Sequence, residues 1–201
     1  MPNVRPKPQK PLRDGYPIPL PGLVIGPRID YDPEMARFLF LILLASPALA
    51  DPSIQVAFSP NGGSTEAVVG VIESAQKSVH VAAYSFTSKP IAEALIQAHQ
   101  RGVEVEAVLD KSNATARYTE AGEIAQAGIP VRVDYRYAIM HDKYLIIDGK
   151  TVETGSFNLT AAAESSNAEN VLILRDAPEI AARYEQNWQG LWAESQPWGS
   201  P

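Results

Sequence analysis

The chain has 201 residues, of which 45% are hydrophobic and 20% charged, and it contains no cysteine. This length suits about one globular domain with additional sequence, and the composition excludes wholesale disorder and a multi-span membrane protein. Without cysteine there is no disulfide, thiolate zinc site or cysteine nucleophile. From residue 51 onward, 11 basic and 19 acidic side chains leave a net charge of about −8, so a polyanion must be bound by local contacts rather than by long-range attraction.

The first 34 residues are rich in proline, with nine of the 17 in the chain. Proline removes a backbone donor and fixes φ, so this density opposes helices and sheet ladders and predicts a disordered extension. Because a signal peptide normally begins a chain, Met35 is a candidate initiator and residues 1–34 a mis-assigned start. A genuine Pro-rich tail is the alternative.

Residues 35–50 have the pattern of a secretory signal peptide. Arg37 precedes an apolar run at 38–44, and Ala-Leu-Ala at 48–50 has the small-x-small cleavage pattern. The apolar run is far shorter than the ~20 residues of a membrane-spanning helix. The segment therefore predicts a periplasmic or secreted protein without stable membrane insertion after cleavage, and a buried core helix is the alternative.

From residue 51 the sequence alternates short β-type runs with helix-like stretches. This pattern predicts a single catalytic α/β domain at 51–201, with a mixed, largely parallel β-sheet flanked by helices. The predicted strands are 54–58, 78–84, 103–109, 130–134, 143–147, 151–154 and 170–174. The predicted helices are 64–75, 90–100, 116–127 and 178–192.

Two of these strands flank an Asp-Gly pair at 148–149, which is a strong signal for a two-residue hairpin turn. With that turn, His141 lies opposite Ser156 and Lys143 lies opposite Thr154. Shifting the two-residue turn by one position keeps the same residues together. Only a three-residue loop would shift the pairing by one residue and separate them.

Side chains alternate along a strand, so His141 and Lys143 are predicted to point to the same face as Ser156 and Asn158. Asp148, seven residues after the histidine, falls on the other face. We therefore expect its carboxylate to hold the turn or a structural partner rather than to contact substrate.

This set of side chains suits cleavage of a phosphodiester. A histidine supplies a nucleophile that can be uncharged near pH 7, and Lys143 supplies a fixed cation for the phosphate oxygens. Ser156 and Asn158 add neutral donors, although a structural role for the serine is an open alternative. An ammonium has no lone pair to ligate a metal and repels cations, so we expect no metal and no other cofactor.

The same region resembles the phospholipase D superfamily and, within it, the small secreted bacterial endonucleases. The HxKxxxxD signature is matched by His141, Lys143 and Asp148, and the trailing Gly-Ser-x-Asn by Gly155, Ser156 and Asn158. The likeness extends over about residues 54–192. It implies that one histidine attacks phosphorus to form a phosphohistidine, while a second protonates the leaving oxygen and then activates water. Each active site therefore needs two copies of the motif.

This chain has one copy, since His80 and His99 lack a lysine two residues on. The resemblance therefore implies a homodimer in which both subunits contribute to one phosphate site. It also points to Glu169 as a carboxylate that orients the imidazole, with a solvated surface glutamate as the alternative. The catalytic set implied by the resemblance is His141, Lys143, Asp148, Ser156, Asn158 and Glu169, of which the lysine, serine and asparagine bind phosphate.

The remaining candidates have simpler interpretations. His80 lies between two valines on a predicted strand, and His99 lies in the last turn of a predicted helix, so both are expected to be structural. Four basic residues near strand ends could bind flanking phosphates or could be ordinary solvated side chains. They are Lys111, Arg117, Arg132 and Arg136.

The sequence thus predicts a metal-independent phosphodiesterase. The leading hypothesis is a non-specific endonuclease acting on DNA, with RNA as a further candidate substrate, because the motif binds phosphate and no base-reading motif is present. The alternatives are a lipid hydrolase of the phospholipase D type and a non-catalytic phosphate- or nucleic-acid-binding module.

Overall fold

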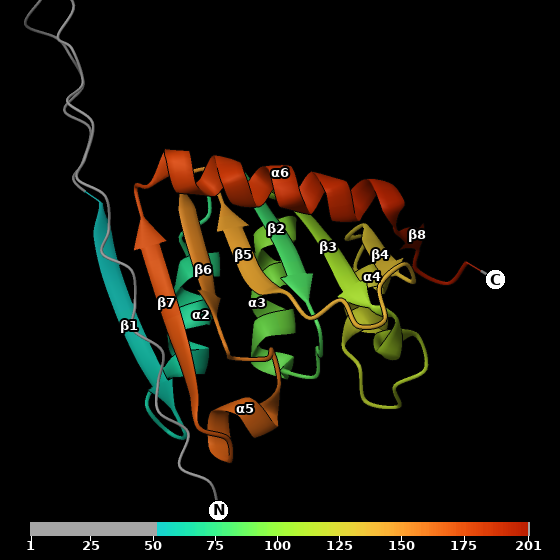
Figure 1. Cartoon of the computed structure of the whole chain (residues 1–201), viewed down its shortest axis with the longest axis horizontal. Helices are drawn as coiled ribbons and strands as arrows, with labels where there is room; N and C mark the ends of the chain where they lie inside the picture. The colour runs from blue at the N-terminus through green and yellow to red at the C-terminus, as the bar shows by residue number, and fades with distance from the viewer. Residues whose placement is uncertain (1–51, 201) are drawn as a thin grey trace, which may run out of the picture. The chain divides into compact units, whose positions relative to one another are not determined.

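The computed structural model describes residues 52–200 (Figure 1). The predictions for residues 1–34 and 35–50 lie outside the described residues. Between residues 52 and 200, every helix is too short or too polar to cross a bilayer.

One eight-stranded sheet forms the centre of the domain, in the order β1-β7-β6-β5-β2-β3-β4-β8 (Figure 1). The strands are β1 (Ser53–Ser59), β2 (Ser78–Ala83), β3 (Glu104–Asp110), β4 (Val131–Asp134), β5 (Lys143–Ile147), β6 (Thr151–Gly155), β7 (Glu169–Arg175) and β8 (Gln196–Pro197). The helices are α2 (Ser64–Glu73), α3 (Lys89–Gln100), the 3₁₀ helix η1 (Lys111–Ala114), α4 (Ala121–Gln126), α5 (Ala161–Ser165) and α6 (Pro178–Glu194). All seven predicted strands are present.

The sheet is mixed, as predicted, but parallel pairing is confined to β2, β3 and β4. The other five pairs of neighbouring strands are antiparallel. Parallel neighbours need a crossover, usually a helix, and α3 and α4 supply it on the parallel side. No helix joins β4 to β5, a tight turn joins β5 to β6, and the connection from β6 to β7 contains only the five-residue α5. The expectation of a largely parallel sheet was therefore wrong for the half of the sheet formed by β1, β7, β6 and β5.

The predicted helix at 116–127 is shorter in the structure, because α4 begins at Ala121. The Thr119 hydroxyl accepts from the Ala121 backbone N–H and lies within hydrogen-bond distance of the Phe86 carbonyl and of Asn113 Oδ1. These tertiary bonds hold the preceding segment as an irregular loop. The short helix α5 was not predicted; its first turn is capped by the Thr160 hydroxyl, which accepts from Ala163 N.

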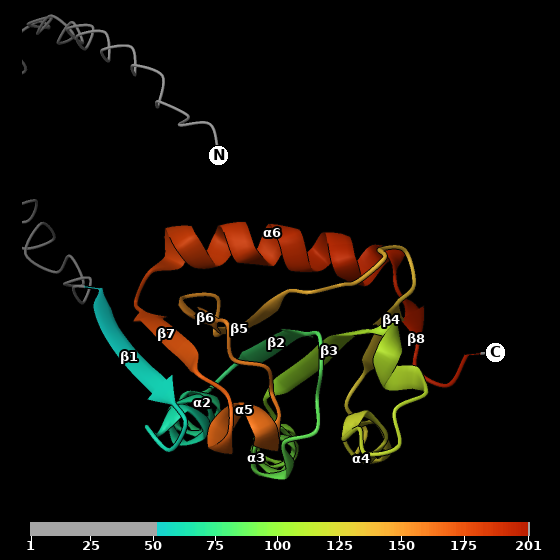
Figure 2. The ribbon, with the colours of Figure 1, turned by 60° about the horizontal axis from the view of Figure 1, so that its bottom comes forward.

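Helices cover the two faces of the sheet unequally (Figure 2). The four α-helices α2, α3, α4 and α5 lie on one face, where the larger hydrophobic core forms, whereas α6 alone crosses the other face over β6, β5, β2, β3 and β4. Trp188 and Leu191 of α6 are buried, and the Trp188 indole N–H donates to the Val81 carbonyl at 3.0 Å. The apolar side of α6 is therefore buried in its second half, while Ile180 at its start is 40% exposed.

Candidate active site at the start of β5

The β5–β6 hairpin has a three-residue turn, not the predicted two-residue turn. Tyr144 pairs with Thr154 and Ile147 pairs with Thr151, which leaves 148–150 as the turn. Asp148 and Gly149 both adopt left-handed conformations, with φ of 54° and 63°. The prediction failed because the turn is shaped by bonds to a distant segment, which local sequence does not reveal.

Those bonds end at the Asp148 carboxylate. It accepts from the backbone N–H groups of Gln76 at 3.1 Å, Lys77 at 2.7 Å and Ser78 at 3.1 Å. The Asp148 N–H in turn donates to the Ser78 carbonyl at 2.9 Å. The aspartate of the signature therefore joins the turn to the start of β2, as expected of a structural partner.

The observed register of β5 and β6 differs from the predicted one, so strand pairing no longer explains how His141, Lys143, Ser156 and Asn158 come together. Extending the observed pairing by one step sets Lys143 opposite Gly155, not opposite Thr154. β6 ends at Gly155, so strand alternation no longer places Ser156 and Asn158. The prediction that strand alternation sets Ser156 and Asn158 on the face of His141 was therefore wrong, and other contacts determine where these two residues lie.

The chain after Gly155 is held by β7. Ser156 N donates to the Asn170 carbonyl, and Ser156 Oγ accepts from Asn170 N, both at 3.1 Å. A Cβ atom at Gly155 would lie 2.0 Å from the Asn170 carbonyl oxygen, so this close approach requires glycine. The exposed Ser156 is thus fixed beside the start of β7, where Glu169 is located.

Asn158 is held against the segment that follows β2. Its neighbours Phe157 and Leu159 are buried, and the Leu159 carbonyl accepts from Thr87 N and Ser88 N at 2.9 Å. Among residues 52–200, Asn158 Oδ1 is buried without a hydrogen-bond partner. Tertiary contacts, rather than strand alternation, hold the backbone next to Asn158 against the segment at 86–88.

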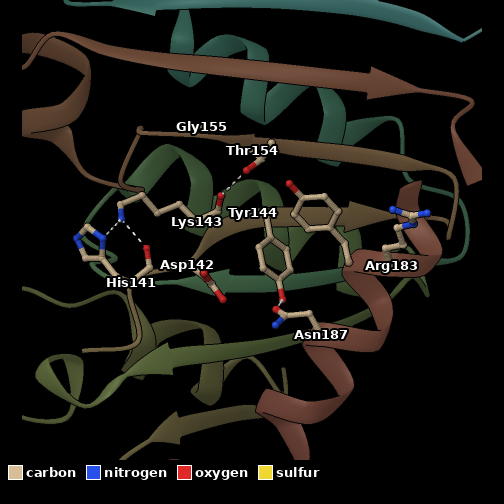
Figure 3. A pocket seen from close by; sticks show the side chains of 9 residues that line it. His141, Asp142, Lys143, Tyr144, Thr154, Gly155, Arg183 and Asn187 are labelled. Atoms are coloured by element: carbon tan, nitrogen blue, oxygen red, sulfur yellow. Dashed lines mark hydrogen bonds between the residues drawn. The ribbon is translucent and has the colours of Figure 1, made fainter. Parts of the chain in front are cut away.

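His141 and Lys143 are in contact at the start of β5 (Figure 3). Lys143 Nζ lies 3.2 Å from His141 Nδ1 and donates to the His141 carbonyl at 2.8 Å. The Tyr84 ring packs beside both groups, with its centroid 4.7 Å from that of the imidazole and 5.5 Å from Lys143 Nζ. Because an ammonium only donates, its contact with Nδ1 is a hydrogen bond only when that nitrogen is unprotonated.

Burial lowers the pKa of the Lys143 ammonium, while the carboxylates of Glu169 and Asp142 act in the opposite direction. Glu169 is therefore near enough to act on this cation. Glu169 Oε1 accepts from Asn167 Nδ2 at 3.2 Å. Lys143, and not Glu169, contacts Nδ1 of His141, so the tautomer-fixing role of Glu169 stays a prediction.

A buried polar network behind His141 was missed by sequence reasoning. Asp110, at the end of β3, accepts from Met140 N and Ser112 N at 2.8 Å, and so fixes the residue before the histidine. Asn113 donates to the Tyr84 carbonyl at 2.7 Å and to the Asp110 carbonyl at 3.0 Å. The available signal was an aspartate directly after an apolar strand, where polar residues often serve a site.

The other basic and histidine candidates mostly have intramolecular partners. Arg132 donates to the Ser195 carbonyl, Arg136 pairs with Glu194 at 2.7 Å, and Lys111 donates to the Tyr137 carbonyl at 2.9 Å. Arg117 lies over the ring of its neighbour Tyr118. His80 bonds Glu185 at 2.8 Å and stacks on Trp188, which agrees with a structural role. Within residues 52–200, no three His, Asp or Glu side chains are grouped as metal ligands.

Comparison with known proteins defines the class. Residues 68–192 match the family model described as cardiolipin synthase, PLD-like domain. The chain therefore belongs to the phospholipase D superfamily.

Individual relatives and structures are similar to most of the described domain. A Rickettsia typhi protein named phospholipase D is 41% identical over 71% of this chain and 69% of its own length. The structure of Nuc from Salmonella typhimurium, a phospholipase D family member, superposes with a TM-score of 0.72 at 42% identity, covering 75% of this chain and 100% of that one. NucT from Helicobacter pylori gives a TM-score of 0.66 at 25% identity, covering 73% and 99%. A mitochondrial cardiolipin hydrolase from Xenopus tropicalis is 36% identical over 61% of this chain and 58% of its own length.

Proposed function

We propose that this protein is a metal-independent phosphodiesterase that hydrolyses DNA through a phosphohistidine formed on His141. The observation that carries the proposal is the contact between Lys143 Nζ and the His141 ring, in an exposed position at the start of β5. A cation beside an unprotonated imidazole supplies a nucleophile and a charge for a phosphate in one place. Membership of the phospholipase D superfamily supports phosphodiester chemistry in general.

In the proposed reaction, substrate phosphate draws the Lys143 ammonium from the imidazole to a phosphate oxygen. A ring nitrogen of His141 attacks phosphorus as the bond to the leaving oxygen breaks, and Asn158 donates to the phosphate. Glu169 accepts from the other ring nitrogen and stabilises the positive charge that forms. A second histidine protonates the leaving oxygen, then removes a proton from the water that attacks the phosphohistidine and frees His141.

The second histidine must come from another copy of the chain. The chain has only three histidines, and within the described residues His80 is bonded to Glu185 and stacked on Trp188. His99 lies in the last turn of α3 and is not part of the His141 site. We therefore propose a twofold homodimer in which His141 of the partner subunit faces His141 across one phosphate.

DNA is the proposed substrate because the sequence resembles the small secreted endonucleases and because the site contains phosphate-binding groups but no base-reading motif. The predicted signal peptide at 35–50 supports action in the periplasm or outside the cell. Lipid hydrolysis is the second candidate. It is favoured by the names of the Rickettsia and Xenopus relatives and by Tyr137 and Ile139, which are 45% and 55% exposed in the segment leading to His141.

The test is cleavage by the purified protein in excess EDTA, with plasmid DNA, RNA and phosphatidylcholine or cardiolipin vesicles as parallel substrates. We expect DNA cleavage that chelation does not reduce. Loss of cleavage with EDTA would contradict the metal-free scheme, and cleavage of lipid without DNA would replace the proposed substrate. Sedimentation of the same sample tests for the dimer, and a fully active monomer would contradict the shared site.

A further inference from the structure

A cleft of about 430 Å³ extends from the proposed catalytic residues to helix α6 (Figure 3). His141 and Lys143 line one end, and Arg183 of α6 lines the other, with residues of β5 and β6 between them. The cleft is therefore an extension of the reacting site along the α6 side of the sheet. None of the predicted site residues explains its far end.

Arg183 is a cation without an intramolecular partner among residues 52–200. It is exposed and forms no salt bridge or side-chain hydrogen bond there. Arg132 and Arg136 differ in this respect, since Arg132 bonds the Ser195 carbonyl and Arg136 pairs with Glu194. The Arg183 guanidinium thus keeps all its donors for a ligand.

The walls between the two cations are polar or aromatic and are already ordered. The Tyr144 hydroxyl donates to Asn187 Oδ1 at 2.5 Å, and the Tyr144 and Tyr184 rings pack edge to face with centroids 4.9 Å apart. Thr154 Oγ1 donates to the Lys143 carbonyl at 3.1 Å. Burial raises the pKa of the Tyr144 hydroxyl, so this side chain stays a neutral donor at physiological pH. Such walls suit a sugar and base better than an acyl chain.

We infer that Arg183 binds the phosphate next to the scissile one, so that the cleft is a subsite for the flanking nucleotide of a polynucleotide. This inference rests on the proposed function, in which Lys143 binds the scissile phosphate. A polynucleotide carries phosphates at regular intervals with a sugar and base between them, which matches two cations separated by polar and aromatic walls. A lipid with two phosphates shares the charge pattern but also needs an apolar wall.

Asp142 lines the same cleft and supplies a sharper test. Its carboxylate repels a phosphodiester backbone that occupies the cleft. If the flanking phosphate lies there, Asp142→Asn tightens binding, while Arg183→Ala weakens it. Opposite effects from two residues in one cleft are not expected of a general loss of stability.

The experiment measures the affinity of a fluorescent single-stranded oligonucleotide by anisotropy in the His141→Ala background, in which the proposed function predicts no turnover. With His141 intact, it measures steady-state cleavage of the oligonucleotide and of bis(p-nitrophenyl) phosphate, which has one phosphate. We expect Arg183→Ala to weaken oligonucleotide binding about 10-fold and to reduce the slope of log affinity against log salt by about 0.7, as for one lost phosphate contact on a single strand. Arg183→Lys should preserve most of that slope. Arg175→Ala, a matched change of an arginine that bonds Gln55 on β1, should leave both quantities unaltered.

Several results would overturn the inference. An unchanged salt slope in Arg183→Ala would remove the phosphate contact, and equal losses on the oligonucleotide and the small diester would place the effect on the reacting site itself. An effect on cardiolipin vesicles without one on the oligonucleotide would assign the cleft to lipid. Because affinity is measured without turnover, failure of the wild-type protein to cleave any diester would contradict the proposed function while still testing the subsite.

Discussion

Two residues of one sequence signature flank strand β5, with His141 before it and Asp148 after it, and their hydrogen-bonding surroundings differ. At the turn, three backbone N–H groups satisfy the Asp148 carboxylate, which links the hairpin to β2. At the start of the strand, His141 is exposed, and its described polar contacts are all with Lys143. A fully satisfied polar group stabilises a fold, whereas a group with spare hydrogen-bonding capacity can act on a ligand. The signature therefore combines a stabilising residue with reactive ones.

The first prediction concerns the loss of the His141 side chain at the start of β5. His141→Ala should lower phosphodiester turnover by at least about 1,000-fold, because it removes the attacking ring nitrogen and the second histidine of the proposed shared site together. The midpoint of thermal unfolding should change little, since the side chain is exposed. Rate assays in EDTA and a thermal scan of the same sample check both parts. A variant that still turns over at an appreciable rate would exclude this nucleophile.

The second prediction concerns the buried carboxyl of Glu153, which pairs on β6 with Leu145 in the middle of β5. Glu153 on β6 is 2% exposed, and burial raises its pKa to about 8. The group is protonated in the folded domain at neutral pH but ionised in the unfolded chain, so its stabilising contribution is present below about pH 4.5 and is lost as pH rises through 8. The free energy of unfolding should fall by up to about 5 kcal/mol across that range.

Urea unfolding at pH 5, 6.5 and 8 measures this dependence in the wild type and in Glu153→Gln, whose amide does not ionise. The difference between the two proteins isolates Glu153 from other titrating groups. Parallel stability profiles would show that this carboxyl does not titrate with folding.

The third prediction concerns the Asp148 carboxylate at the turn after β5. Asp148→Asn removes the charge from an acceptor of three backbone N–H groups while keeping a side chain that tolerates a left-handed backbone. We expect a loss of about 2–3 kcal/mol in the free energy of unfolding. Turnover at low temperature should be largely kept.

Asp176→Asn is the matched control for this change. Asp176 also has a left-handed backbone, with φ of 51°, but among residues 52–200 its carboxylate forms only an exposed pair with Lys150. Its substitution should cost less than about 1 kcal/mol. Equal destabilisation by the two variants would contradict a special role for the β2 contact.

The fourth and smallest expected effect concerns the charge state of the reactive end. Burial lowers the pKa of Lys143, so activity should fall at alkaline pH below the range usual for lysine, because the ammonium is present only below its pKa. Glu169 and Asp142 raise that pKa, so Asp142→Asn should move the alkaline limb of the kcat profile to lower pH by a fraction of a unit. A shift to higher pH would show that the carboxylate does not act on this ammonium.

Local pattern predicted most of the fold. The alternation of apolar residues predicted every strand of the sheet except the two-residue β8, and the Asp-Gly pair predicted the hairpin. The turn length was wrong because Asp148 bonds to Gln76, Lys77 and Ser78, and no local rule reports a contact across about 70 residues. The start of α4 was wrong for a similar reason, since Thr119 bonds to the loop after β2.

The site was partly predictable. His141 and Lys143 were expected to lie together because they are two residues apart on a strand, and they do. Asn158 and Ser156 were assigned by a strand register that the structure does not have, and contacts with other elements hold them instead. Asp110 follows an apolar strand, which indicates a polar role, but its contact with Met140 joins β3 to the segment before β5 and is not revealed by spacing. Arg183 could not be assigned, because the cleft that it lines lies between β5 and α6.

The most direct test of the account is to trap the covalent intermediate. Wild-type protein turning over a diester labelled in its phosphate should be quenched in alkali, where phosphohistidine persists, and the labelled residue located by peptide mass spectrometry. The account predicts label on His141 and none in Lys143→Ala protein that has lost turnover. Label on another side chain, or steady turnover with no label on His141, would contradict it.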